Sequence, residues 1–90
     1  MIQAPHLKGL AGLQRLDLAH TEVTDDGLAH LKGMARLEYV NLWGTKVSES
    51  GLVNLKRLSK LEELRLGSTN VTDDGVKMLQ AALPKCKIKR

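Results

Sequence analysis

The chain repeats itself every 24 residues over most of its length. Leu13, Leu37 and Leu61 begin three units that align without a gap. The same apolar positions recur in each unit, as in Leu16/Val40/Leu64, Leu18/Leu42/Leu66, Val23/Val47/Val71, Leu28/Leu52/Val76, Leu31/Leu55/Leu79 and Leu10/Met34/Leu58/Ala82. A period of this length is typical of a solenoid, in which each unit buries its apolar face only against its neighbours. The period therefore restricts the fold more than any other feature of the chain.

Each unit reads as a strand, a turn and a helix. In the second unit, residues 39–42 alternate polar and apolar, which predicts a short strand with one buried face. Leucines at positions 52, 55 and 58 follow at the spacing of one helical stripe. Ser48 precedes this helix as an N-cap candidate, as do Thr24 and Thr72 in the flanking units. Acidic residues follow each cap, so we interpret them as structural groups that favour the helix start.

Stacking such units predicts a curved architecture. Neighbouring parallel strands lie about 4.8 Å apart, whereas helix axes need about 8–10 Å. The strands must therefore form the inner, concave wall and the helices the outer, convex face. We predict a right-handed α/β solenoid with four parallel strands and three to four helices. A threonine column, Thr21/Thr45/Thr69, falls at the turn after each strand, where its hydroxyls can bond main-chain groups left unpaired by the bend.

The repeat unit resembles that of leucine-rich repeat proteins. It has the form Leu-x-x-Leu-x-Leu-x-x-Thr-x-Val-Thr-Asp-x-Gly-Leu-x-x-Leu-x-x-Leu, and it is most similar to the 24-residue units of bacterial, planctomycete-like proteins. Threonine stands where many members have asparagine or cysteine, and the middle unit replaces Thr-Asp-x-Gly-Leu by Ser-Glu-Ser-Gly-Leu. The resemblance implies a non-catalytic scaffold that binds a protein or peptide. It also implies that the chain could be the excised end of a larger multidomain bacterial protein.

The two ends differ from the inner units. We divide the single domain into a half repeat at 1–12, repeats at 13–36, 37–60 and 61–82, and a C-terminal capping strand within 83–90. The half repeat supplies a helix but no strand, so the first strand is left uncapped. This favours a homo-oligomer formed through the N-terminal edge. At the other end we expect a strand at 86–88 that arrives two residues early, with Cys86 and Ile88 in the core columns and lysines alternating with them to oppose further pairing.

Composition narrows the classes of partner. The net charge is +4, and Lys85, Lys87, Lys89 and Arg90 account for it, so the repeats themselves are neutral. Lysines on an edge strand oppose pairing with a further strand, which explains this basic tail. We therefore expect no nucleic-acid partner. The single Cys86 excludes an intramolecular disulfide. No apolar run is long enough for a membrane span, so we expect no membrane partner and, if the chain is complete, a cytoplasmic location.

The candidate binding surface is formed by the strand residues that point away from the core. Tyr39 and Trp43 are the only aromatic residues, and both fall on this wall in one strand, as binding anchors often do. An alternative is that Trp43 simply packs on Gly67. Charged residues surround the pair as a polar rim, although they could also pair with one another across strands. The predicted binding residues are Arg15, Asp17, Tyr39, Asn41, Trp43, Glu63 and Arg65.

In the predicted alignment, the wall has three columns. They read Arg15/Tyr39/Glu63/Lys85, Asp17/Asn41/Arg65/Lys87 and Ala19/Trp43/Gly67/Lys89. The sequence shows no phosphate loop, nucleophile elbow or Ser/His/Asp arrangement, and its three histidines have no repeated cysteine or carboxylate partner. We therefore predict no enzyme activity, no cofactor and no metal site.

Overall fold

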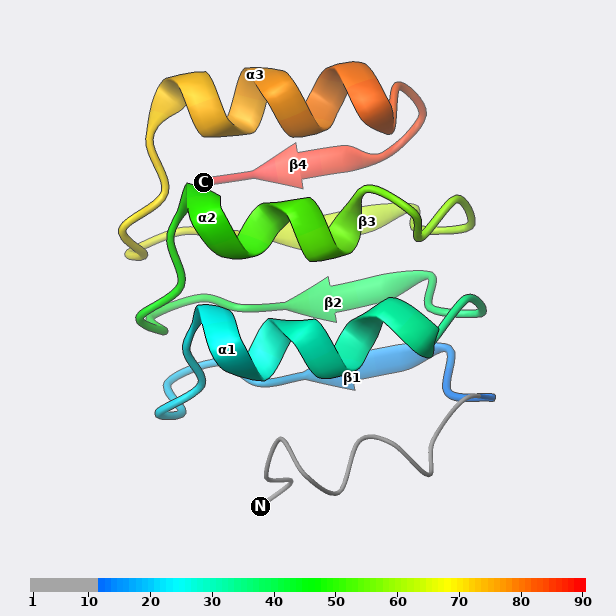
Figure 1. Ribbon diagram of the computed structural model, residues 1–90, viewed down its shortest axis with the longest axis horizontal. Coiled ribbons are helices and arrows are strands. Elements are labelled where there is room, and N and C mark those ends of the chain that lie inside the picture. Colours follow the sequence, from blue (N-terminus) through cyan, green and yellow to red (C-terminus); the bar gives the residue numbers. More distant parts are fainter. Residues whose placement is uncertain (1–11) are drawn as a thin grey trace.

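The structure, a computed structural model, describes residues 12–90 as a single parallel sheet covered on one face by helices (Figure 1). The four strands are paired in sequence order, each to the next. Their bounds are β1 Arg15–Asp17, β2 Tyr39–Asn41, β3 Glu63–Arg65 and β4 Lys87–Lys89. Successive strands of the three repeats pair residue for residue at a separation of 24, as Leu16 with Val40 and Val40 with Leu64. The predicted α/β solenoid is confirmed.

The convex layer is built from short helices. In the first two repeats, one α-helical turn continues as a 3₁₀ helix, whereas the third repeat has a regular α-helix of 10 residues. The bounds are α1 Asp25–Leu28, η2 Ala29–Gly33, α2 Glu49–Leu52, η3 Val53–Leu55 and α3 Asp73–Ala82. No helix in residues 12–90 is long and apolar enough to cross a membrane.

The glycine column at the helix starts lets neighbouring repeats approach closely. A Cβ atom on Gly51 would lie 2.3 Å from the Asp25 carboxylate, and one on Gly75 would lie 2.7 Å from the Glu49 Cβ atom. Both contacts are shorter than real Cβ atoms tolerate, so a side chain at these positions would push the helices apart. The recurring glycine is therefore a packing requirement of the stack.

The core is a continuous stack of aliphatic side chains between the sheet and the helices. The middle residue of each repeat strand is buried, with exposed fractions of 2% at Leu16 and 0% at Val40 and Leu64. The leucines of the helical stripe join the same cluster. The side chains predicted to form shared layers do so among the described residues, with the exception of Ala82, which is exposed. Burial of this kind contributes about 25 cal/mol for each Å² of apolar surface.

The threonine ladder forms as expected. The Oγ1 atoms of Thr21, Thr45 and Thr69 donate to the carbonyl oxygens three residues earlier, at 2.7, 2.7 and 2.6 Å. Thr45 is 3% exposed, and it is the only buried polar residue in the described part of the chain. Each hydroxyl thus satisfies a main-chain acceptor where the strand bends toward the helix.

Acidic residues link one repeat to the next rather than only favouring helix starts. The Asp25 carboxylate accepts hydrogen bonds from the main-chain N–H and the hydroxyl of Ser48, at 2.7 and 2.5 Å. The Glu49 carboxylate accepts from the Thr72 hydroxyl at 2.8 Å in the same way. All three predicted N-cap residues occupy the N-cap position, but only the Thr72 side chain accepts a helical N–H, at 3.1 Å from Gly75.

The C-terminal strand keeps the 24-residue register, so the expected early arrival is wrong. Leu64 pairs with Ile88, and the wall positions beside it are therefore Lys87 and Lys89 rather than Lys85 and Lys87. Cys86 occupies the position equivalent to Leu61. The N–H of Cys86 donates to the carbonyl of Leu83, as the N–H of Leu61 donates to the carbonyl of Leu58. The helix α3 is one residue longer than the alignment assumed, which places Leu83 in the core and leaves Ala82 exposed.

Arg90 forms hydrogen bonds with the third repeat. Its guanidinium donates to the Asp73 carboxylate and, at 2.9 Å, to the carbonyl of Val71. In the preceding repeat, the equivalent carbonyl of Val47 accepts the N–H of Asn70 from the next repeat at 3.0 Å. The Arg90 side chain thus donates to an acceptor whose equivalent, one repeat earlier, accepts a main-chain N–H. The predicted N-terminal helix lies outside the described residues, as does whatever adjoins the outer edge of β1.

Candidate functional site

The concave wall presents two columns of side chains from the flanking positions of each strand. Pairing places Arg15, Tyr39, Glu63 and Lys87 in one column and Asp17, Asn41, Arg65 and Lys89 in the other. They face outward because each repeat strand has only its middle residue in the core, with an exposed or half-buried residue on either side. The strand period of two therefore creates the wall directly.

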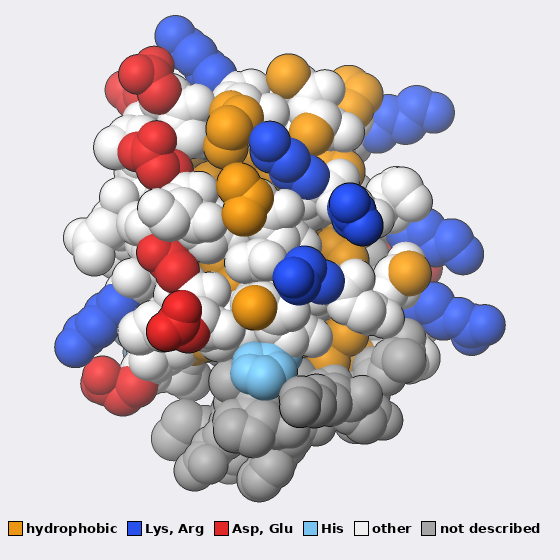
Figure 2. Space-filling view, in the orientation of Figure 1, with side chains coloured by type: hydrophobic (Ala, Val, Ile, Leu, Met, Phe, Trp, Pro, Cys, Tyr) orange, Lys and Arg blue, Asp and Glu red, His pale blue; other side chains and the backbone are white. Residues whose placement is uncertain are grey.

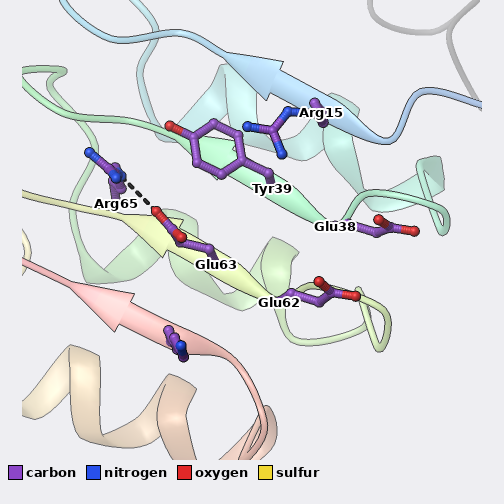
Figure 3. A pocket seen from close by; sticks show the side chains of 7 residues that line it. Arg15, Glu38, Tyr39, Glu62, Glu63 and Arg65 are labelled. Carbon is purple, nitrogen blue, oxygen red and sulfur yellow. Dashed lines mark hydrogen bonds and ion pairs between the residues drawn. The ribbon is translucent and has the colours of Figure 1, made fainter.

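A depression of about 340 Å³ lies on this wall around Tyr39 (Figure 3). Figure 3 shows the Tyr39 ring between Arg15 on β1 and Glu63 and Arg65 on β3. The Arg15 guanidinium carbon lies over the ring, 4.3 Å from its centroid, in a cation–π arrangement. The lining residues are Arg15, Glu38, Tyr39, Glu62, Glu63, Arg65 and Lys87.

The charges beside Tyr39 are arranged as a small network. Arg65 Nε donates to Glu63 Oε2 at 2.7 Å, and the Lys89 ammonium approaches the same oxygen at 4.0 Å. The hydrogen bond from Arg65 is the main reason that the pKa of Glu63 is lowered, and the nearby lysines lower it further. The same hydrogen bond raises the pKa of Arg65. Both side chains are therefore charged at neutral pH and held in a defined orientation.

Two of the predicted binding residues shape the ends of their strands. Asp17 accepts the N–H of Ala19, and Asn41 accepts the N–H of Trp43, both at 3.0 Å. These are turns closed by a side chain, of the kind that short polar residues form with their own main chain. Neither residue lines the depression, so part of their hydrogen-bonding capacity serves the fold.

Trp43 lies on the wall but against its neighbour. A Cβ atom at Gly67 would come within 2.0 Å of the indole ring, so the indole covers that glycine closely. This is the packing that the alternative interpretation of Trp43 predicted. The side chain nevertheless remains 38% exposed. Tyr39 lines the depression and Trp43 does not, so the two aromatic residues are not equivalent.

Glu38 and Glu62 also line the depression, although they are not among the binding residues predicted from the sequence. Both lie just before a strand. Two residues, rather than the single residue of a regular strand, separate Leu37 from Val40 and Leu61 from Leu64. The carbonyl of Glu38 accepts two N–H groups, from Glu62 at 2.7 Å and from Glu63 at 3.1 Å, which fixes the local chain. The repeated Leu-Glu pair at 37–38 and 61–62 is the signal that could have identified them.

The wall offers recognition chemistry rather than a reactive group. Cys86 is 4% exposed, and burial raises the pKa of its thiol to about 11, so it is a neutral, inaccessible group at physiological pH. Within residues 12–90, no three histidine, cysteine or carboxylate side chains converge as metal ligands would. The groups that remain available are an aromatic ring, guanidinium and ammonium donors, and carboxylate acceptors.

Comparison with known proteins agrees with this architecture. A family model described as leucine-rich repeat matches residues 13–31 and 57–79. The chain is a leucine-rich repeat protein. A search of curated proteins found no match. The assignment to the bacterial repeat type stays a prediction.

Solved structures share the leucine-rich repeat fold over almost the whole chain. The Mex67:Mtr2 subunits of Chaetomium match with a TM-score of 0.76 at 19% identity, over 96% of this chain and 66% of that one. A leucine-rich repeat protein of Leptospira interrogans matches with a TM-score of 0.68 at 16% identity, over 100% of this chain and 28% of that one. The chain thus spans under two thirds of either neighbour. Leucine-rich repeat domains are typically non-catalytic scaffolds for protein interaction.

Proposed function

We propose that this leucine-rich repeat protein binds a protein or peptide partner on its concave wall, without catalytic turnover, with Tyr39 at the centre of the contact. The observation that supports this most is the depression around Tyr39, in which the ring is flanked by arginines from the strands on either side. Tyrosine and arginine are enriched among residues that dominate binding energy. One structural neighbour is itself described as the Mex67:Mtr2 subunits, which fits a fold used between proteins.

The order of the side chains supports the same proposal. Arg15 is stacked on Tyr39, and Arg65 is bonded to Glu63 at 2.7 Å. Side chains that are already oriented lose less conformational entropy when a partner binds. Glu38, Glu62 and Lys87 complete the surround of the ring. Together they form a mixed-charge rim around an aromatic centre, as in many protein interfaces.

Trp43, Asp17 and Asn41 have secondary parts in this proposal. Trp43 extends the aromatic surface along β2 with the exposed part of its indole. Asp17 and Asn41 fix the strand ends through their main-chain bonds, so they position the wall more than they contact the partner. Substitution of either is expected to weaken binding through the shape of the wall.

The test is to select binders from a random peptide library and to map them on the isotope-labelled chain by NMR. We expect a selected peptide to shift the amide signals of β2 and β3. We also expect Tyr39→Ala to weaken its binding by at least about tenfold, corresponding to about 1.4 kcal/mol. Val53→Ala, at an exposed position on the opposite face, is the matched control and should bind normally. Peptides that shift only convex-face signals, or that bind Tyr39→Ala as tightly as the parent chain, would contradict the proposal.

A further inference from the structure

The convex face, opposite the proposed binding wall, carries three parallel bands of side chains (Figure 2). An acidic band follows the N-terminal ends of α1, α2 and α3, and a basic band follows the helix ends and the loops after them. Segments 29–37, 53–61 and 76–85 contain no acidic residue. The acidic band comprises Glu22, Asp25, Asp26, Glu49, Asp73 and Asp74, of which Glu22 pairs with Lys46 and Asp73 with Arg90, and the basic band comprises Lys32, Arg36, Lys56, Arg57, Lys60, Lys77 and Lys85.

An apolar ridge separates the two bands. Ala29 on η2 and Val53 on η3 occupy the same position of successive repeats, and Val53 is 50% exposed. In the third repeat this position is the exposed Lys77, and the adjacent Met78 on α3, 38% exposed, continues the apolar surface. In Figure 2 the hydrophobic side chains run along the stack between the acidic side and the basic side. Single exposed apolar side chains are ordinary on a protein surface, so the ridge supports an interface only together with the order of the charged bands.

The fold itself does not account for all these charges. Asp26 and Asp74 form no side-chain hydrogen bond or ion pair with any residue from 12 to 90, and neither do the residues of the basic band. A helix dipole favours acids in the first turn and bases in the last. Arg36 and Lys60, however, lie beyond the last turns of η2 and η3, which end at Gly33 and Leu55.

We infer that the occupant of this face is a second copy of the chain, related by a two-fold axis that runs parallel to the direction of stacking. Across the convex face of one copy, the order of the bands is acidic, apolar, basic. Rotation about that axis reverses this order in the second copy. Each acidic band then faces the basic band of the other copy, and the two ridges meet. The other two-fold axis in the plane of the face would place like charges together. A two-fold interface is self-complementary, and the order of these bands is self-complementary in one arrangement only.

This interface differs from the edge-to-edge contact expected from the sequence, and it leaves the concave wall free in both copies. It does not depend on the proposed function. The ridge is narrow and the flanks are charged, so we assign the dimer to the weak class that forms at micromolar to millimolar concentrations. Because exposed charges are screened over about 10 Å at 0.1 M salt and about 3 Å at 1 M, the association must weaken as salt rises.

Sedimentation equilibrium over that concentration range tests the dimer. The mass should rise with concentration toward twice the 9.9 kDa of one chain, and less steeply at high salt. Val53→Glu, which buries a charge in each ridge, should hold the chain as a monomer. Glu38→Lys on the concave wall is the control for a changed net charge and should leave the dimer intact.

Charge reversal gives a second test that does not rest on the ridge. The pair Asp26→Lys with Asp74→Lys replaces two of the six acids of the acidic band by lysine, and Lys32→Glu with Arg57→Glu replaces two residues of the basic band by glutamate, so each variant weakens the attraction between the bands. Each variant alone should dimerise more weakly than the parent chain, and an equimolar mixture should associate more tightly than either variant alone, with circular dichroism checking that each is folded. A parent chain that stays monomeric at millimolar concentration overturns the proposal. A dimer whose affinity is changed neither by Val53→Glu nor by the charge substitutions also overturns it.

Discussion

The middle residue of each repeat strand is similar from one repeat to the next, whereas the flanking residues differ. Leu16, Val40 and Leu64 occupy one buried column and are nearly interchangeable aliphatic side chains. The column beside it contains an arginine, a tyrosine, a glutamate and a lysine. Stacking requires every unit to present the same shape to its neighbours, so repetition identifies what the fold needs. Variation within the same strands identifies what is left for a partner.

The strongest test of this comparison is to remove a buried side chain and a wall side chain from the same strand pair. Leu64→Ala deletes a fully buried group, and we expect a loss of about 2–5 kcal/mol in the free energy of unfolding. Lys87→Ala on the adjacent wall should change it by no more than about 0.5 kcal/mol. Urea unfolding measures both. Equal losses would show that the wall is part of the core.

A second test concerns the junctions between repeats. Asp25→Ala removes the acceptor of two Ser48 hydrogen bonds at a partly buried site and should cost about 1–3 kcal/mol, because an N–H is left unpaired. Asp73→Ala is the matched substitution in the last repeat, where the carboxylate is 84% exposed and pairs with Arg90. Its cost should be about 0–1 kcal/mol. Thermal unfolding of the two variants checks the difference, and the same shift in both would refute it.

The period was sufficient to predict the fold and the division into core and wall. A 24-residue repeat fixes which residues share a layer, and the alternation at 39–42 fixes which of them face outward. The predicted wall residues Arg15, Tyr39, Glu63 and Arg65 do lie together around one depression. These predictions hold because they depend only on periodicity, which every unit repeats.

Features that depend on a single place in the chain were not predictable in this way. Glu38 and Glu62 fall outside the strict alternation, since an extra residue separates the leucine from the strand core. The hydrogen bonds that Ser48 donates to the Asp25 carboxylate join residues 23 apart, one less than the period, so column alignment does not pair them. The register of β4 depended on one additional helical residue before Leu83, which no repeated pattern specifies.

The last core position offers a third test of the comparison. Cys86 continues the buried column of Leu37 and Leu61 and is 4% exposed. Burial raises the pKa of its thiol to about 11. At pH 8 its reaction with a disulfide reagent should therefore be about a hundredfold slower in the folded chain than in urea. A folded chain that reacts as fast as the unfolded one would place Cys86 in solvent.

The same thiol predicts a change of stability in alkali. Between the ordinary thiol pKa of about 9 and the raised value of about 11, the folded chain binds more protons than the unfolded chain. The free energy of unfolding should therefore fall as pH rises through this interval. Cys86→Ala removes this part of the decline and is the control. An identical decline in the parent chain and in Cys86→Ala would show that the thiol is not the source.

The smallest effect is expected on the wall itself, at Glu63. The hydrogen bond from Arg65 lowers the pKa of this carboxyl below its ordinary value of about 4.5, so the folded chain binds fewer protons there than the unfolded chain. The resulting stabilisation is present above the ordinary pKa and is lost as pH falls through the lowered one. Melting curves of the parent chain and of Glu63→Gln should therefore differ slightly at pH 6 and converge toward pH 3. A difference in stability that does not depend on pH, or one as large as that of Leu64→Ala, would mean that Glu63 is required for folding. The variable wall positions would then not be independent of the stability of the fold.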